Sequence, residues 1–185
     1  MSADFLVELG TEELPPKALL SLSEAFTQGI VDRLEAENLN FAEVTAYAAP
    51  RRLALVIKSL ETQAPDSELV AWGPPVAVAF DADGQPTRAA EAFANKNGLA
   101  VSDLSQHIEN DGQQDKLCIR RIETGAQTRS LLADVVNGSL GALPIPKRMR
   151  WGNSKEEFVR PVQWAVLLFD GEVCEETILG VTSSN

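Results

Sequence analysis

The chain has 185 residues, of which 44% are hydrophobic and 23% are charged, a composition typical of a globular protein that excludes wholesale disorder. Acidic residues outnumber basic ones by 27 to 16, and the resulting net charge of −11 disfavours non-specific nucleic-acid binding. The longest purely apolar run, residues 164–169, is six residues long, whereas a membrane-spanning helix needs about 20. The sequence therefore predicts a protein that does not cross a membrane.

The N-terminal residues carry no basic region followed by an apolar stretch, so no secretory signal is visible. This favours a cytoplasmic location. It also favours two reduced cysteines, Cys118 and Cys174, over a disulfide. A single histidine, His107, argues against a His-rich metal site, and no glycine-rich phosphate-binding motif is present.

The first third of the chain predicts a strand, a long helix and two more strands. Residues 4–9 alternate as a strand, and the following segment, with Pro16 suited to a helical first turn, predicts an amphipathic helix of about 20 residues. Residues 44–48 and 53–60 read as strands. The apolar positions of the predicted helix are Leu19, Leu22, Phe26, Ile30 and Leu34.

The rest of the chain mixes short elements without a regular β–α–β rhythm. Residues 64–75 read as a loop and residues 76–80 as a weak strand. Helices are expected over 87–97, stopped by Gly98, and over 128–143, with one further helical turn at 102–106 and a strand at 116–122.

Residues 162–169 are apolar on both faces, which predicts a central strand. The pair Asp170-Gly171 predicts a hairpin whose return strand covers 172–179. The expected fold is therefore α+β, a mixed and largely antiparallel sheet with packed helices. We expect one region spanning 1–185, with the segment 65–75 as the best candidate for an internal boundary.

Two groups of charged residues are candidates for function. Glu8, Glu12 and Glu13 crowd the first strand–helix turn, where carboxylates could act as acid and base or simply stabilise the start of the helix. Without a histidine or metal partner, the second interpretation is favoured. Residues 147–160 contain five basic and two acidic residues, whereas residues 1–46 contain nine acidic and two basic ones.

The basic segment could contact phosphates, with an indole available for stacking, or its arginines could pair with the protein's own acids. Composition alone leaves both interpretations open. The candidate RNA-binding residues are Lys147, Arg148, Arg150, Trp151 and Arg160, with Arg51 and Arg52 as a second, weaker basic spot.

Five segments in chain order carry a specific resemblance. Residues 6–16 read Leu-Val-Glu-Leu-Gly-Thr-Glu-Glu-Leu-Pro-Pro, and the others cover residues 49–54, 80–87, 146–152 and 158–164. Together they resemble the opening part of the β subunit of the bacterial two-subunit glycyl-tRNA synthetase. Members of that family are several times longer, so the resemblance implies an N-terminal fragment, truncated at its C-terminus inside a domain.

The resemblance implies an enzyme of two α and two β subunits that attaches glycine to tRNA-Gly. The α subunit would bind ATP, with magnesium, and glycine, whereas the β subunit would bind tRNA. No cofactor, metal or catalytic residue is expected in this chain, and the fragment alone is expected to be inactive. Two other hypotheses remain, a scaffold that contacts the α subunit without touching tRNA, and a stand-alone enzyme that uses the three glutamates.

Overall fold

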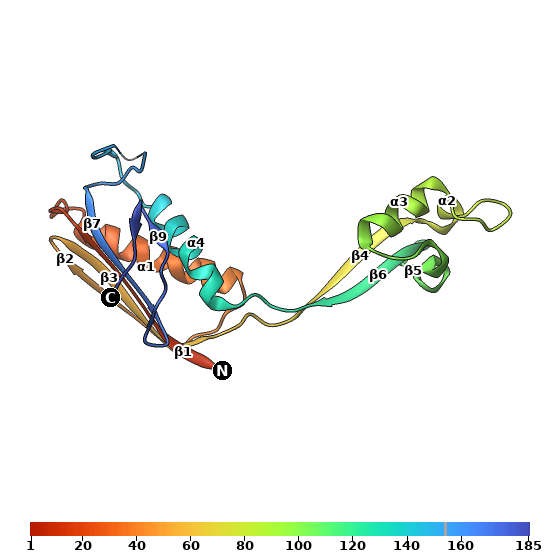
Figure 1. Cartoon of the computed structure of the whole chain (residues 1–185), viewed down its shortest axis with the longest axis horizontal. Helices are drawn as coiled ribbons and strands as arrows, with labels where there is room; N and C mark the ends of the chain where they lie inside the picture. The colour runs from red at the N-terminus through yellow and green to blue at the C-terminus, as the bar shows by residue number, and fades with distance from the viewer. Residues whose placement is uncertain (154) are drawn as a thin grey trace. The chain divides into compact units, whose positions relative to one another are not determined.

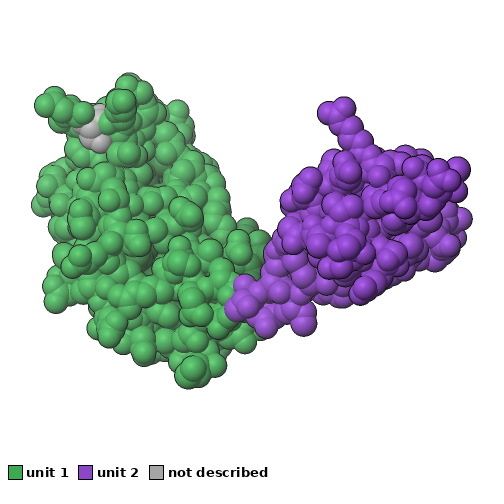
Figure 2. Space-filling view, turned by 45° about the vertical axis from the view of Figure 1, so that its right-hand side comes forward, with its two compact units in different colours: residues 1–65, 125–185 green, residues 66–124 purple. Residues whose placement is uncertain are grey.

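The structure is a computed structural model that describes residues 1–153 and 155–185, and it divides into two compact units. Unit 1 comprises residues 1–65 and 125–185, and unit 2 comprises residues 66–124 (Figure 2). The first change of unit falls at the start of the segment 65–75, which the sequence singled out. The second, at Thr124 and Gly125, lies where the sequence suggested no boundary.

Unit 1 is built on a five-stranded antiparallel sheet in the order β2-β3-β1-β7-β8. The long strand β1 lies in the middle and pairs with β3 and β7. Its alternating residues place Phe5, Val7 and Leu9 on the buried face. The strands are β1 (Ser2–Thr11), β2 (Glu43–Ala49), β3 (Arg52–Glu61), β7 (Val162–Phe169) and β8 (Glu172–Val173).

Two helices, α1 (Leu19–Ala36) and α4 (Thr128–Gly141), pack against one another and cover one face of this sheet (Figure 1). The predicted apolar face of α1 is confirmed, because Leu22, Phe26, Ile30 and Leu34 are at most 1% exposed. Leu19 is only partly buried at the start of the helix. Pro16 lies in the turn just before α1 rather than in its first turn.

The strand predicted at 162–169 is confirmed as β7 and is internal to the sheet, but the packing of both its faces, which the apolar pattern implied, is not observed. Strand β7 lies between β1 and the two-residue strand β8, and only one of its faces is packed against the helices. The outward-facing Leu168 lies opposite Leu6, which in turn lies opposite Val56. Its two-sided apolar pattern therefore reflects contacts between neighbouring strands and not a second layer.

The hairpin at Asp170 and Gly171 is confirmed, with φ of 56° and 74°, but its return strand is shorter than predicted. It ends at Val173, and the next residue, Cys174, is buried in the core. The remaining residues form a separate two-stranded sheet of β9 (Thr177–Ile178) and β10 (Val181–Thr182).

Unit 2 contains a three-stranded antiparallel sheet in the order β4-β6-β5, with helical segments that enclose a small core. The sheet is formed by β4 (Ser67–Pro75), β5 (Ile108–Asn110) and β6 (Asp115–Glu123). The helical segments are α2 (Val76–Ala79), α3 (Arg88–Asn97) and the 3₁₀ segment η1 (Val101–Gln106). Gly98 ends α3 in the left-handed conformation, as the sequence predicts.

Two predictions in unit 2 are wrong. The segment predicted as a loop before residue 76 forms β4, because it pairs with the strongly patterned β6. The segment predicted as a weak strand forms the single helical turn α2, which follows Pro75 with its φ of −55°. The antiparallel sheets with packed helices nevertheless confirm the α+β class. No helix formed by residues 1–153 and 155–185 is long and apolar enough to cross a membrane, and Cys118 and Cys174 are buried free thiols.

Candidate functional site

Three of the five segments singled out in the sequence meet at one end of the larger sheet. Strand β1 ends at Thr11, the turn between β2 and β3 holds Arg51, and Pro161 leads into β7. Backbone N–H groups join these segments, from Thr11 to the Arg51 carbonyl over 3.0 Å and from Glu12 to the Pro161 carbonyl over 3.0 Å. Residues more than 100 positions apart are therefore fixed in one small region.

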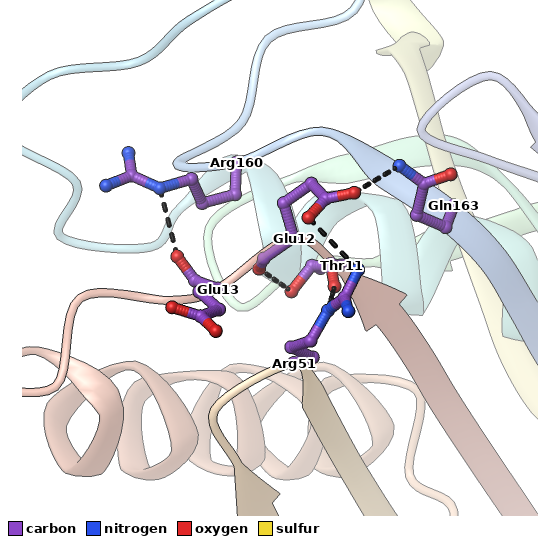
Figure 3. Close-up of polar contacts among 6 residues, drawn as sticks. All are labelled: Thr11, Glu12, Glu13, Arg51, Arg160 and Gln163. Carbon is purple, nitrogen blue, oxygen red and sulfur yellow. Dashed lines mark hydrogen bonds and ion pairs between the residues drawn. The ribbon is translucent and has the colours of Figure 1, made fainter.

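Glu12 is the centre of a polar cluster in this region (Figure 3). Its Oε2 accepts a hydrogen bond from Arg51 Nη2 at 3.0 Å, and its Oε1 accepts one from Gln163 Nε2 at 2.9 Å. Arg51 Nε also donates to the carbonyl of Thr11 at 3.4 Å. The Glu12 carboxylate thus links Arg51 of the β2–β3 turn to Gln163 of β7. It also orients the Arg51 guanidinium.

Gly10 provides the space for an aromatic contact beside this cluster. It lies opposite Arg52 on one side and Trp164 on the other. A Cβ atom on Gly10 would lie 2.0 Å from Trp164 Cε2, so the indole rests directly on the glycine backbone. The Arg52 guanidinium lies 5.2 Å from the centre of the indole ring, and its Nε bonds Glu8 Oε1 at 3.1 Å. Only glycine at position 10 permits this packing.

A cleft of about 700 Å³ opens between these side chains. Its walls combine two guanidinium groups, a carboxylate, an amide and an indole. Guanidinium groups match phosphate geometry, and an indole can stack on a planar ring. The lining residues are Thr11, Glu12, Ala49, Pro50, Arg51, Arg52, Gln163 and Trp164.

The three glutamates considered as an acid–base set do not form one. Glu8 bonds Arg52 and Glu12 bonds Arg51, so the two carboxylates are held by different arginines and not by one another. Glu13 is exposed and uses its carbonyl to accept a hydrogen bond from Arg160 Nε at 3.0 Å. Among residues 1–153 and 155–185, no three His, Cys, Asp or Glu side chains are grouped so that they could hold a metal ion.

The described residues of the basic segment, 147–153 and 155–160, form a loop whose arginines are largely engaged in hydrogen bonds and ion pairs within this chain. Arg148 donates to the carbonyl oxygens of Gly141 at 2.8 Å and Leu143 at 3.2 Å. Arg150 Nε bonds Glu157 Oε1 at 2.7 Å but remains 65% exposed. Trp151 is partly buried against the main core. These contacts explain how the loop keeps its shape.

The seven predicted RNA-binding residues thus fall into two groups. Arg51, Arg52 and Arg160 lie at the end of the sheet, and Lys147, Arg148, Arg150 and Trp151 lie on the loop. Sequence reasoning did not select Gln163 and Trp164 as site residues, and it did not foresee that Glu12 would organise them. The available signal was their position inside the same segments that carry the family resemblance.

Comparison with known proteins gives a consistent result over the whole chain. A family model described as glycyl-tRNA synthetase beta subunit matches residues 5–185. The glycine–tRNA ligase beta subunit of Pseudomonas fluorescens strain Pf0-1 is 54% identical over 180 residues, which cover 97% of this chain and 25% of the relative. The beta subunit from Hahella chejuensis is 50% identical over 182 residues, covering 98% of this chain and 26% of the relative. The chain therefore spans about a quarter of the length of these relatives.

Proposed function

Because the chain belongs to the glycyl-tRNA synthetase beta subunit family, we propose that it is part of a glycine–tRNA ligase, in which it binds tRNA-Gly. The observation that carries this proposal is the match over residues 5–185, which includes all five segments noted in the sequence. In the proposed enzyme, two α and two β subunits attach glycine to tRNA-Gly. The α subunit holds ATP with magnesium, and the enzyme acts in the cytoplasm.

The end of the larger sheet is the proposed RNA contact of highest priority. The side chains of Arg51 and Arg52 are 60% and 54% exposed, so both keep N–H groups available beside their carboxylate contacts. Each can donate to a phosphate oxygen, while Trp164 offers the edge or face of its indole to a ribose or base. Glu12 and Glu8 act as positioning residues because they fix the direction of the two guanidinium groups.

The basic loop is the second proposed contact. Arg150 is the best placed of its arginines because most of its side chain is exposed. Lys147 is exposed and forms no ion pair with any residue in 1–153 or 155–185. Arg148 and Trp151 support the loop, so we propose that they influence RNA binding through its shape.

A salt series tests the RNA contact directly. The whole β subunit, assembled with its α subunit, is titrated with tRNA-Gly as wild type and as Arg51→Ala/Arg52→Ala. Each lost phosphate contact should reduce the slope of log K against log salt by about 0.7–0.9, so the double variant should flatten it by about 1.5. The matched control is Arg121→Ala in unit 2, an arginine that is 50% exposed and paired with Glu123.

The alternative is a scaffold that contacts the α subunit without touching RNA. One observation favours it: Arg51, Arg52 and Arg150 each already bond a carboxylate of this chain. An unchanged salt slope in a folded Arg51→Ala/Arg52→Ala variant would support this alternative and overturn the RNA contact at the sheet end.

We also propose that this chain alone does not activate glycine. The cleft at the sheet end contains no glycine-rich loop to hold a triphosphate, and its one lining carboxylate, Glu12, is bonded to Arg51 and Gln163. Glycine-dependent exchange of pyrophosphate into ATP should be absent for the purified chain. Exchange above background that disappears in Glu12→Gln would instead support the stand-alone enzyme.

A further inference from the structure

A second cavity, distinct in chemistry from the polar cleft, lies between the start of α1 and the loop that follows α4. Its volume is about 550 Å³, within the usual range of ligand pockets. We call it the proline groove, because Pro15, Pro144 and Pro146 line it together with Ala18, Leu22, Ile145, Met149 and Val159. Lys147 and Arg160 complete its lining.

The walls of the proline groove are fixed before anything binds. Leu22 and Val159 belong to the main core and are 1% and 7% exposed. The loop wall is held by Arg148, which bonds two backbone carbonyl groups at the end of α4. Three prolines restrict the backbone further. A binding partner would therefore meet a preformed surface and lose little free energy in ordering it.

The lining selects for an apolar group. Apart from the two basic side chains it contains only aliphatic residues, proline and methionine, and no aromatic ring. A nucleobase would lose hydrogen bonds at its edges without replacement in such a place. An aliphatic or aromatic protein side chain loses none. Met149, which lines the groove, is 39% exposed, so its side chain is accessible to a partner.

The charge at the groove selects for an acidic neighbour. The basic residues of unit 1 for which ion pairs are seen among the described residues, for example Arg51, Arg52 and Arg129, do not line the groove. Lys147 and Arg160 form no ion pair within residues 1–153 and 155–185, and Arg160 bonds only the carbonyl groups of Glu13 and Val159. Two positive charges therefore flank an apolar groove on a chain whose net charge is −11.

We propose that the proline groove docks a segment of the partner subunit of the synthetase, one that places a large apolar side chain beside one or two carboxylates. The apolar side chain fills the groove next to Met149, and the carboxylates pair with Lys147 and Arg160. In this arrangement Arg51, Arg52 and Arg150 remain the proposed RNA contacts. Lys147 and Arg160 serve the partner subunit instead. This inference rests on the proposed function, because the name beta subunit carried by the relatives implies a second kind of subunit.

A photo-crosslinking amino acid identifies the occupant. Met149 is replaced by p-benzoylphenylalanine in the whole subunit, and the enzyme assembled with its partner and tRNA-Gly is irradiated. The expected product is a crosslink to an acidic, apolar segment of the partner. A crosslink within the same chain, a crosslink to tRNA, or the absence of any crosslink would overturn the proposal. The control carries the same amino acid at Leu20, which is 70% exposed on α1 and does not line the groove.

Association of the two purified subunits, measured without tRNA, provides a second readout. Met149→Glu should weaken it at least tenfold, because a charge replaces the apolar contact. Lys147→Gln should weaken it less and reduce its salt dependence. Leu20→Glu, the matched control, should change it less than twofold. Circular dichroism verifies that each variant is folded.

The outcomes separate this inference from the proposed function. Normal association of a folded Met149→Glu variant would overturn the groove assignment alone. Failure of the wild-type subunits to associate would overturn the proposed function together with it.

Discussion

The two units of the chain reach the same fold class with very different cores. Unit 1 buries large residues from both helices and four strands, including Phe5, Phe26 and Leu55. The hydrophobic cluster of unit 2 has five buried residues, of which three are alanines, and only Cys118 and Ile119 are buried beside it in that unit. Four of the five family segments lie in unit 1, and the fifth, residues 80–87, lies in unit 2. Both proposed sites are also in unit 1.

The difference indicates which forces maintain each unit. Burial of large apolar side chains dominates in unit 1. Unit 2 spans only residues 66–124, and a domain of that size gains little from its core. It supplements burial with ion pairs across its sheet, where Arg120 bonds Glu68 of β4 at 3.2 Å and Glu109 of β5 at 2.8 Å. A network in which one arginine joins carboxylates on the two neighbouring strands contributes more than an isolated surface pair.

The largest expected effect is in the core of unit 1. Phe26→Ala should lower the free energy of unfolding of unit 1 by about 3–5 kcal/mol, because the ring is 1% exposed and its loss leaves a cavity. Urea denaturation of wild type and variant measures this loss in the free energy of unfolding. Leu20→Ala, on the exposed side of the same helix, should cost less than about 0.5 kcal/mol. Equal losses for the two variants would show that α1 does not pack as described.

A corresponding substitution in the core of unit 2 should show that the two units unfold independently. Leu117→Ala truncates one of the two leucines in the hydrophobic cluster of unit 2, at a cost of about 2–4 kcal/mol. Amide hydrogen exchange should then accelerate throughout residues 66–124 and stay slow in β1 and β3. Ile122→Ala, at a position that is 76% exposed on the same strand, is the control. Accelerated exchange in both units would mean that they unfold together.

Disturbing the contact between Trp164 and Gly10 at the sheet end should cause a loss of stability of intermediate size. Gly10→Ala would drive a methyl group into the Trp164 ring, and such overpacking costs about 1–3 kcal/mol. The displaced indole would also lose its contact with the Arg52 guanidinium, and the tryptophan fluorescence should change as a result. Gly141→Ala, where an added Cβ meets nothing within 4 Å, is the matched control. Unchanged fluorescence and stability in Gly10→Ala would contradict the packing of Trp164 on Gly10.

The smallest expected effect is the pH dependence that Asp111 gives to the stability of unit 2. The Lys116 ammonium, with help from the N–H groups of Gln114 and Gln113, lowers the pKa of Asp111 from 3.8 to about 2. The folded unit thus favours the ionised carboxylate. The resulting stability is present above about pH 4 and is lost as the pH falls toward 2.

Trp72 is the only tryptophan of unit 2, so its fluorescence in a Trp151→Phe/Trp164→Phe background can follow unfolding of that unit. Asp111→Asn should flatten the decline in stability between about pH 4 and pH 2. Asp83→Asn, at an exposed carboxylate that forms no ion pair with the described residues, should not. Equal pH profiles for wild type and Asp111→Asn would show that the pair with Lys116 does not stabilise unit 2.

The sequence by itself determined the local elements of this protein and its family. Periodicity alone predicted the buried face of α1, and Asp170-Gly171 predicted the hairpin, because both depend on neighbouring residues. Predictions were wrong where a distant partner decides the outcome. Ser67–Pro75 is a strand because β6 lies beside it, and β7 has one packed face because α1 and α4 lie only on that side.

The candidate site shows the same division. Arg51, Arg52 and Arg160 could be selected from the sequence as basic residues within family segments. The sequence could not show that Glu12 would bond both Arg51 and Gln163. Nor could it show that the Trp164 indole would pack on Gly10. These contacts join residues that are far apart in the chain. Pairing of β1 with both β3 and β7 brings them together, and only the tertiary structure contains that information.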